Sequence, residues 1–467
     1  YSHTFNANYN IPINKIPLFS WLTASARYSS TYNWTASPKS IQSTIANTID
    51  NSNTIQLTGN INLSSLYNNI GYLKRLDSKR GPRNRRAPPQ SKSKTDDGDD
   101  AAGDKRKPDS DTTSVVEEEK EKINYFKIIG ESVVKVLIGL KTASLSYQEG
   151  NGTTLPGFIP EPGAIGNNWS SNAPGLGFLF GSQRDIRQDA VEKGWLTTDT
   201  SLNTAYMTKL TQNLTARATY EPFRGFRIEF TANRNYSENF QEYFVADASG
   251  EFKSSAPMRT GSFSISTITL NTAFGKSGDD LKSEIFESMK TNRLQVANRL
   301  GARNPWSQGI VDSTGYPDGY GPASQDVLLY SFLSAYTGTS PDKVKLKTFP
   351  TIPLPNWRIT FDGLMNIEFI KKYLRNITLS HAYRSTYNIG SFTTNVQYDE
   401  LDGFAYARYT GNNNFIPEQE IAMVSINEQF SPLINVDMTW NNSLMSKIEY
   451  KKTRNLSFSF VNNQLTE

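Results

Sequence analysis

The sequence predicts an all-β fold, a segment of an antiparallel transmembrane β-barrel with long inserted loops that contain short helices. Three observations lead to this prediction. Apolar and polar residues alternate with a period of two, over runs about twice the average strand length of roughly 5–6 residues. The polar positions hold mainly Ser, Thr and Asn instead of the Lys and Glu that protect a soluble sheet. Tyr and Trp gather toward one end of some runs, as they do at a membrane interface.

The composition fits such a barrel. The chain has 467 residues with 25 Phe, 23 Tyr and no Cys, and its mean hydropathy is −0.53. It has no apolar stretch of about eighteen residues that could form a spanning helix. A polar average is also typical of outer-membrane barrels, because lipid-facing and lumen-facing residues alternate. The chain starts at Tyr1 without a signal peptide, and we interpret it as an interior piece of a longer precursor.

Residues 1–64 are predicted to be barrel strands. The chain opens with "YSHTFNANYNIPI", in which the odd positions are mostly apolar and the even positions up to Asn10 are polar. The same alternation follows in "LTASARYSSTYNWTA" and in "TIQLTGNINL". From Leu22 to Tyr32 is ten steps of roughly 3.3 Å, and a tilt of about 40° leaves on the order of 25 Å, the height of the apolar band on an outer-membrane barrel.

Residues 65–131 are predicted to be a charged, disordered loop. Positions 74 to 94 carry nine Lys or Arg and one acid, and positions 96 to 122 carry eleven acids and five Lys or Arg. Such a segment cannot build a core. A nucleic-acid reading of "KRGPRNRR" is disfavoured, because acids follow at once and the net charge of the chain is only +4.

The remaining segments alternate between strands and insertions. We predict a strand at 132–148, a Gly/Pro/aromatic loop at 149–202, strands at 203–275, a helical insertion loop at 276–354 and strands at 355–467. The helices of the second insertion are expected in "DDLKSEIFESMKTNRLQVANRL" and in "SQDVLLYSFLSAYTG", the latter starting near Ser324. Insertions this long are usually lids or plugs when they are ordered.

Two sets of residues are predicted to carry function. The first faces lipid from the strands: Tyr28, Tyr32, Trp34, Phe226, Ile228, Phe230, Ile377, Leu379, Phe458 and Phe460. The second forms a loop gate or partner contacts: Phe158, Trp169, Phe178, Phe180, Trp306, Tyr316 and Tyr320. Apolar loop residues exposed to water would form an aggregation-prone patch. We therefore expect this second set to pack on each other as a cap, or to pack on a partner.

Catalytic and metal-binding motifs are missing from this sequence. His3 and His381 are the two histidines, and both lie on the predicted lipid side of their strands. Without Cys, zinc clusters and thiol nucleophiles are excluded from this piece. We therefore predict a protein that is not an enzyme and that uses no cofactor and no metal.

Four strings point to a known family. They are "NAPGLGFLFGSQRDIRQDAVEKGW", "LTARATYEPFRGFRIEFTANRNYSENF", "FPTIPLPNWRITFDGL" and "LRNITLSHAYRSTYNIGSF". In these strings the sequence resembles the SprA (Sov) family of outer-membrane translocons in the type 9 secretion system of Bacteroidetes. The resemblance runs through most of the chain, apart from the charged loop at 74 to 122.

The resemblance implies that the barrel is very large, a single chain of about 36 strands, to which this piece would supply roughly a third. It further implies a protein-conducting channel in the Gram-negative outer membrane that exports folded cargo with C-terminal secretion signals, linked to gliding motility in some bacteria. Its implied partners are the lipid bilayer, a PorV-like shuttle protein at a lateral opening and a periplasmic plug protein.

Two alternatives stay open. One is a TonB-dependent or lipopolysaccharide-assembly barrel, and the other is a soluble β-rich surface adhesin, whose strands would alternate too. The sidedness of the loops also stays open, because strand alternation places the long loops at 65–131 and 276–354 on the same side as the short turns.

Overall fold

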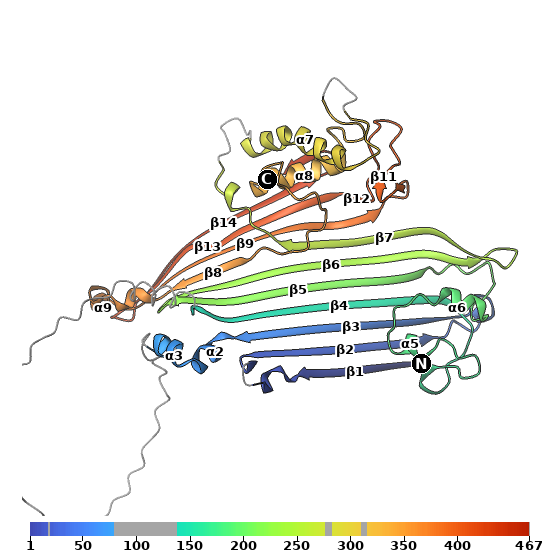
Figure 1. Cartoon of the computed structure of the whole chain (residues 1–467), viewed down its shortest axis with the longest axis horizontal. Coiled ribbons are helices and arrows are strands. Elements are labelled where there is room, and N and C mark those ends of the chain that lie inside the picture. Colours follow the sequence, from blue (N-terminus) through green and yellow to red (C-terminus); the bar gives the residue numbers. More distant parts are fainter. Residues whose placement is uncertain (17–18, 79–137, 276–282, 310–314, 467) are drawn as a thin grey trace, which may run out of the picture.

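One large antiparallel sheet dominates the chain (Figure 1). We analysed it in a computed structural model, whose described residues are 1–16, 19–78, 138–275, 283–309 and 315–466. Strands make up 49% and helices 20% of the described residues, which confirms the predicted all-β class with helices in the insertions. The large sheet has 13 strands, close to the dozen suggested by the alternation.

Most strands lie in sequence order, because hairpin links join neighbours directly. The order is β1-β2-β3-β4-β5-β6-β7-β9-β13-β14-β15, with β12 beside β9 and β8 between β6 and β9. The bounds are β1 (Ser2–Ile11), β2 (Leu22–Thr35), β3 (Asn47–Asn62), β4 (Leu140–Phe158), β5 (Tyr206–Phe223), β6 (Phe226–Ala246), β7 (Phe252–Ser266), β8 (Asn356–Phe361), β9 (Leu374–Thr394), β12 (Gln419–Ile421), β13 (Met423–Trp440), β14 (Met445–Ser459) and β15 (Gln464–Thr466). A separate hairpin consists of β10 (Glu400–Leu401) and β11 (Phe404–Ala405).

The helices lie in the links between strands. Their bounds are η1 (Pro12–Lys15), α1 (Gln42–Ile45), α2 (Leu63–Asn69), α3 (Gly71–Ser78), η3 (Ala164–Gly166), α5 (Leu176–Leu179), α6 (Arg187–Glu192), η4 (Leu270–Thr272), α7 (Glu284–Arg303), α8 (Gln325–Thr337), η5 (Gly363–Asn366) and α9 (Glu368–Tyr373). We call residues 159–205 the β4–β5 insertion, the described parts of 267–355 the β7–β8 insertion, and residues 395–418 the β9–β12 connection.

Strands β7 and β8 together fill one position in the sheet. Strand β6 pairs with β7 along its second half and with β8 along Phe226–Thr231, and β9 does the same from the other side. The β7–β8 insertion therefore leaves and re-enters in the middle of a strand. Side chains close the gap: Asn356 Oδ1 accepts a hydrogen bond from the Ser385 amide at 2.9 Å, and Ser266 Oγ accepts one from the Asn233 amide at 2.6 Å.

The observed boundaries correct several expectations. Strand β4 begins at Leu140 and runs to Phe158, so ten residues of the expected loop at 149–202 belong to a strand. Residues 65–78 of the expected disordered loop form most of α2 and α3, and residues 79–131 lie outside the described residues. The segment 355–467 contains the β9–β12 connection as well as strands.

Pro156 explains why the end of β4 was missed. Proline is read as a strand breaker because it lacks an amide donor. The ladder between β4 and β5 ends at Thr154, paired with Met207, whereas Pro156 pairs with Thr48 of β3. Pro156 thus lies where β4 has a ladder on one side only, so the missing donor removes no bond from the other side.

Candidate functional site

The two faces of the sheet differ in chemistry over most of β1 to β6. Paired residues of an antiparallel sheet lie on one face, so the register defines each face. One cross-strand row reads Leu22, Ile61, Ala143, Ala218, Phe230 and Trp357, and we call the face that carries it the apolar face. A row on the opposite, polar face reads Asn10, Ser25, Thr58, Ser146, Thr215 and Asn233. The polar face is therefore an uncharged wall of hydroxyls and amides along this row.

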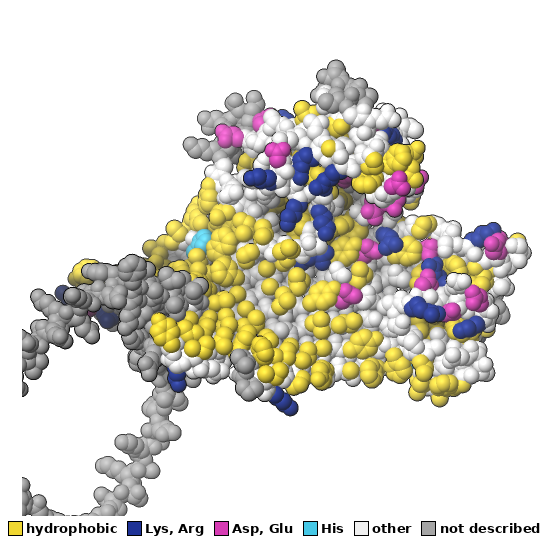
Figure 2. All heavy atoms as spheres, viewed as in Figure 1, with side chains coloured by type: hydrophobic (Ala, Val, Ile, Leu, Met, Phe, Trp, Pro, Cys, Tyr) yellow, Lys and Arg dark blue, Asp and Glu magenta, His cyan; other side chains and the backbone are white. Residues whose placement is uncertain are grey.

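The apolar face is bare over the half that lies near the short turns. Figure 2 shows apolar side chains gathered over this part of the molecule. Leu57 is 48% exposed and Leu145 is 52% exposed, and the other large exposed side chains of this bare half include Tyr9, Ile55, Ile434, Ile448 and Tyr450. A shallow apolar depression of about 490 Å³ crosses β3 to β6, where Gly59, Ala143, Ala216, Ala218 and Ala232 keep the surface low.

The other half of the apolar face is covered by protein. The β4–β5 insertion covers one part of this covered half, where Phe178 and Leu179 of α5 pack on Tyr32, Ile49 and Leu155. The Tyr32 and Phe178 rings meet edge to face, with their centroids 6.2 Å apart. The insertion therefore packs on the apolar face of its own strands, and these aromatic side chains form the core between them.

Polar side chains of the covered half bind the backbone of this insertion. Asn51 Nδ2 donates to the carbonyls of Phe178 at 3.0 Å and Ser182 at 2.8 Å, and Asn53 Nδ2 donates to Gly181 at 2.6 Å. Both asparagines are buried. Because buried polar groups are stable only when they are paired, these asparagines fix the position of the insertion on the sheet.

The β7–β8 insertion covers the other part. Helix α8 is buried from Val327 to Tyr336, because the sheet lies on one side of it and α7 is among its neighbours. Phe332 of α8 stacks on Phe458 of β14, with a centroid distance of 5.9 Å. A helix that is apolar on all sides is expected in such a position.

A buried ion pair lies where this insertion leaves the sheet. Glu428 of β13 and Arg454 of β14 approach to 2.9 Å, and their side chains are 1% and 9% exposed. Glu428 Oε1 also accepts hydrogen bonds from Thr269 Oγ1 at 2.6 Å and Tyr383 OH at 2.9 Å. Arg454 donates to the carbonyl of Thr272 at 2.7 Å. Since Thr269 and Thr272 belong to the first turn of the insertion, this polar cluster ties its root to β9, β13 and β14.

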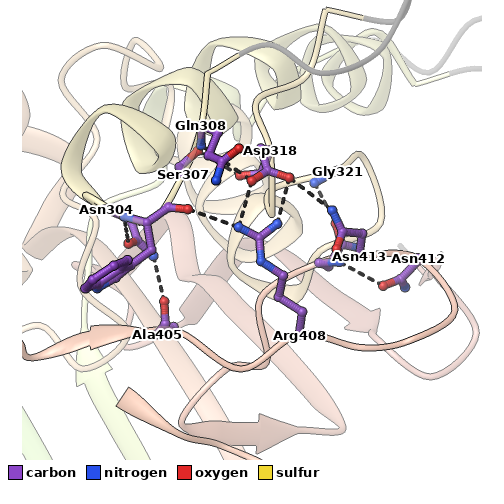
Figure 3. A network of polar contacts seen from close by, with 11 residues as sticks. Asn304, Ser307, Gln308, Asp318, Gly321, Ala405, Arg408, Asn412 and Asn413 are labelled. Carbon is purple, nitrogen blue, oxygen red and sulfur yellow. Dashed lines mark hydrogen bonds and ion pairs between the residues drawn. The ribbon is translucent and has the colours of Figure 1, made fainter. Parts of the chain in front are cut away.

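A second network ties the β7–β8 insertion to the β9–β12 connection (Figure 3). Arg408 donates to both carboxylate oxygens of Asp318, at 2.6 and 2.7 Å, and also to the Trp306 carbonyl at 3.0 Å. Asn413 Nδ2 donates to Asp318 as well, at 3.0 Å. These donors, Arg408 first, hold the pKa of the Asp318 carboxyl below its usual value. Asn304 Nδ2 adds a bond to the Ala405 carbonyl at 2.9 Å.

The predicted loop residues divide into buried and exposed ones. Phe158 is a buried residue of β4 and not of a loop, and Phe178 and Tyr320 are buried in the two insertion cores. This corrects the expectation that these three could contact a partner directly. Trp169 and Phe180 are exposed, at 58% and 41%, whereas Trp306 and Tyr316 are partly buried against the core.

The predicted lipid-facing residues all lie on the apolar face, but protein covers some of them. Tyr32 is 0% exposed beneath the β4–β5 insertion, and Phe458 is buried against α8, so neither can face lipid. Trp34 and Phe460 pack at the edges of the same two cores, and Ile377 is also buried. The remaining five are also partly exposed: Tyr28, Phe226, Ile228, Phe230 and Leu379.

Both histidines lie within hydrogen-bond distance of backbone carbonyls. His3 Nε2 lies 3.0 Å from the Leu179 carbonyl, and His381 Nδ1 lies 2.7 Å from that of Leu433. In the described part of the chain, no three or more His, Cys, Asp or Glu side chains gather as a metal site. Among the described helices, none is long and apolar enough to cross a membrane.

Sequence reasoning missed Asn51, Asn53, Glu428 and Arg454. The sequence does contain an indication of them. All four are polar residues at positions of their strands that otherwise hold apolar side chains. Such a break in the alternation marks the points where the covering insertions attach.

Comparison with known proteins adds little to this picture. No protein-family model and no curated protein matches the chain. Among solved structures, CdiB from Acinetobacter baumannii aligns with 98% of this chain at 5% identity and a TM-score of 0.16. The chain spans 50% of that protein. A similarity at this level carries no argument about fold or function.

Proposed function

We propose that the chain forms part of the wall of an outer-membrane β-barrel that conducts proteins. One observation carries the proposal: from β1 to β6 the sheet has a polar face rich in Ser, Thr and Asn and, opposite it, a bare apolar half. Lipid outside and a water-filled lumen inside are the two solvents that such a sheet matches. A soluble adhesin would expose the same apolar half to water, where large exposed apolar patches are avoided.

The edges of the sheet favour a barrel with more strands. In the described residues, β1 pairs with β2 alone, and β14 pairs on its outer side with β15 over just Ser457–Ser459. Unpaired backbone groups are costly in lipid, so both edges require further strands. Because barrel diameter grows with the number of strands side by side, the 11 neighbouring strands of this sheet and additional ones would enclose a lumen wide enough for a protein.

The polar face suits a passing protein. Its Ser, Thr and Asn side chains offer many weak and replaceable hydrogen bonds and few fixed charges, so a cargo can move along it without being held. With the sequence resemblance, this supports a type 9 secretion translocon of the SprA kind in the outer membrane of Bacteroidetes. Its cargo would be folded proteins with C-terminal secretion signals, and a PorV-like shuttle and a periplasmic plug would assist it.

Single cysteines test the face assignment, because the chain has none of its own. We expect a membrane-impermeant maleimide to label Ser146→Cys and Thr58→Cys in the assembled full-length protein, and to leave Leu145→Cys and Leu57→Cys unlabelled. A photo-crosslinker at Ser146 should also capture exported cargo, whereas one at Leu145 should capture none. Equal labelling of the two faces would contradict the barrel, and normal export without crosslinks from the polar face would contradict a cargo channel.

A further inference from the structure

The β10–β11 hairpin of the β9–β12 connection lies at the surface, next to the β7–β8 insertion. Its strands are joined by Asp402 and Gly403, which have φ values of 56° and 78°. Positive φ at both positions is the backbone of a tight two-residue hairpin turn. The hairpin exposes Leu401, Phe404 and Tyr406, and the neighbouring Val396 is 83% exposed, the highest value for a large apolar side chain among the described residues. Figure 2 shows an apolar patch with acidic side chains on this part of the molecule.

Contacts with the β7–β8 insertion hold this exposed patch in place. Trp306 Nε1 donates to the Leu401 carbonyl at 3.2 Å, and its ring meets that of Tyr406 edge to face at 5.2 Å. Just beyond the hairpin, Arg408 forms its two-point bond with Asp318 (Figure 3). Apolar side chains on a rigid support, left uncovered in water, are typical of a binding surface.

The exposed charge of this segment of the chain is one-sided. Asp399, Glu400 and Asp402 are exposed on the hairpin, and Glu418 and Glu420 are exposed just after it. Arg408 is the sole basic residue between 391 and 420, and it is bound to Asp318. This acidic rim stands out in a chain whose net charge is +4.

An open pocket adjoins the hairpin. It has a volume of about 610 Å³, within the usual range for ligand sites, and its lining is both polar and apolar. The lining residues are Gln397, Ala407, Arg408, Tyr409, Thr410, Gly411, Asn412 and Ile416.

We propose that the hairpin and this pocket form a docking surface for a basic segment of a partner protein, which places an apolar side chain on the Leu401–Phe404–Tyr406 patch and Lys or Arg residues against the acidic rim. An apolar centre with a charged rim is the usual anatomy of a protein interface, and complementary charge selects the partner. A membrane surface is disfavoured, because anionic headgroups would be repelled by the same acids. The proposal goes beyond the channel function and does not depend on it.

Peptide binding to the detergent-solubilised protein tests this surface. The probe is a fluorescein-labelled peptide of alternating Lys and Leu, and its twin carries Glu in place of Lys. We expect the Lys peptide to bind more tightly than the Glu peptide, and Asp399→Asn, Glu400→Gln and Asp402→Asn together to weaken its binding about tenfold. The matched control neutralises three exposed acids elsewhere, with Glu161→Gln, Glu192→Gln and Glu251→Gln, and should leave binding within about twofold.

The apolar centre needs its own variant. Phe404→Ser with Tyr406→Ser should weaken the Lys peptide while leaving its salt dependence unchanged, because only apolar contact is lost. Equal binding of both peptides, or equal loss in the hairpin and control variants, would overturn the proposal. Binding to phosphatidylglycerol vesicles that is lost in the hairpin variants would overturn it in favour of a membrane surface. Cysteine labelling of the sheet reports on the barrel separately, so failure of one test leaves the other standing.

Discussion

The two halves of the apolar face follow the same alternation and meet different surroundings. In β3, the bare half holds Ile55, Leu57 and Ile61, and the covered half holds Asn51 and Asn53 together with Ile49. Strand β4 changes in the same way, from Ala143 and Leu145 to Asn151 and Thr153. The covered half needs polar groups because it must hold the backbone of an insertion. On the same face, the stretches Ile55–Ile61 of β3 and Ala143–Tyr147 of β4 carry no charged or amide side chain.

This difference shows that the odd or even position of a residue in a strand tells which face it lies on, but not whether lipid, water or protein covers it. Tyr28 and Tyr32 share one strand and one face, yet one is partly exposed and the other is fully buried. The border between the halves is therefore the feature to test.

The largest effect is expected at the buried ion pair on the border. Glu428→Ala leaves Arg454 buried without its carboxylate, which should lower the free energy of unfolding by about 3–5 kcal/mol. Limited proteolysis should then cut the β7–β8 insertion earlier, because its root loses the bond to Thr269. The double variant Glu428→Leu and Arg454→Met should recover part of the stability. A single variant as stable as the wild type would mean that packing alone holds the insertion.

A charge placed on the bare half should destabilise the barrel in a lipid bilayer. Leu145→Arg is expected to lower barrel stability by about 2–4 kcal/mol in a bilayer, if the residue lies near the midplane. Ser146→Arg, its neighbour on the polar face, should be tolerated. The measurement is the urea midpoint of the heat-modifiable folded band in liposomes. Equal effects of the two variants would remove the distinction between the faces.

The sequence predicted the bare half better than the covered half, for a physical reason. Apolar and polar residues alternate regularly where one face meets lipid and the other meets water. The sequence therefore predicts a strand at 54–63, and this prediction stops before Asn53 and Asn51, the polar residues on the apolar face of β3. The first half of β3 and the end of β4 carry polar residues on both faces, which looks like a loop. The division of one strand position between β7 and β8 depends on contacts across about ninety residues, and no local pattern reports it.

A smaller effect is expected from acid at the Asp318–Arg408 pair. Because the pKa of Asp318 is lowered in the folded chain, the pair contributes stability above the ordinary Asp pKa of about 3.9 and loses it as the pH falls through the lower folded value. We expect the amide protection factors of the β9–β12 connection to fall as the pH drops below the ordinary Asp pKa, with about 1.5–3 kcal/mol of local stability lost once the carboxyl is protonated. Asp318→Asn should remove this step, so an unchanged acid step in that variant would assign it to other carboxyls.

The smallest effect separates the two tyrosines that straddle the border. Tyr28 OH donates to the Phe180 carbonyl at 2.5 Å, so Tyr28→Phe should cost about 0.5–1.5 kcal/mol. The Tyr32 hydroxyl is buried and has no hydrogen-bond partner among the described residues. Tyr32→Phe removes that unsatisfied group and keeps the ring against Phe178, so it should leave stability unchanged or raise it slightly. Chemical denaturation of both variants in the same detergent gives the comparison. A clear loss on Tyr32→Phe, equal to that on Tyr28→Phe, would show that the covered half holds a partner for this hydroxyl and that the insertion sits on β2 differently.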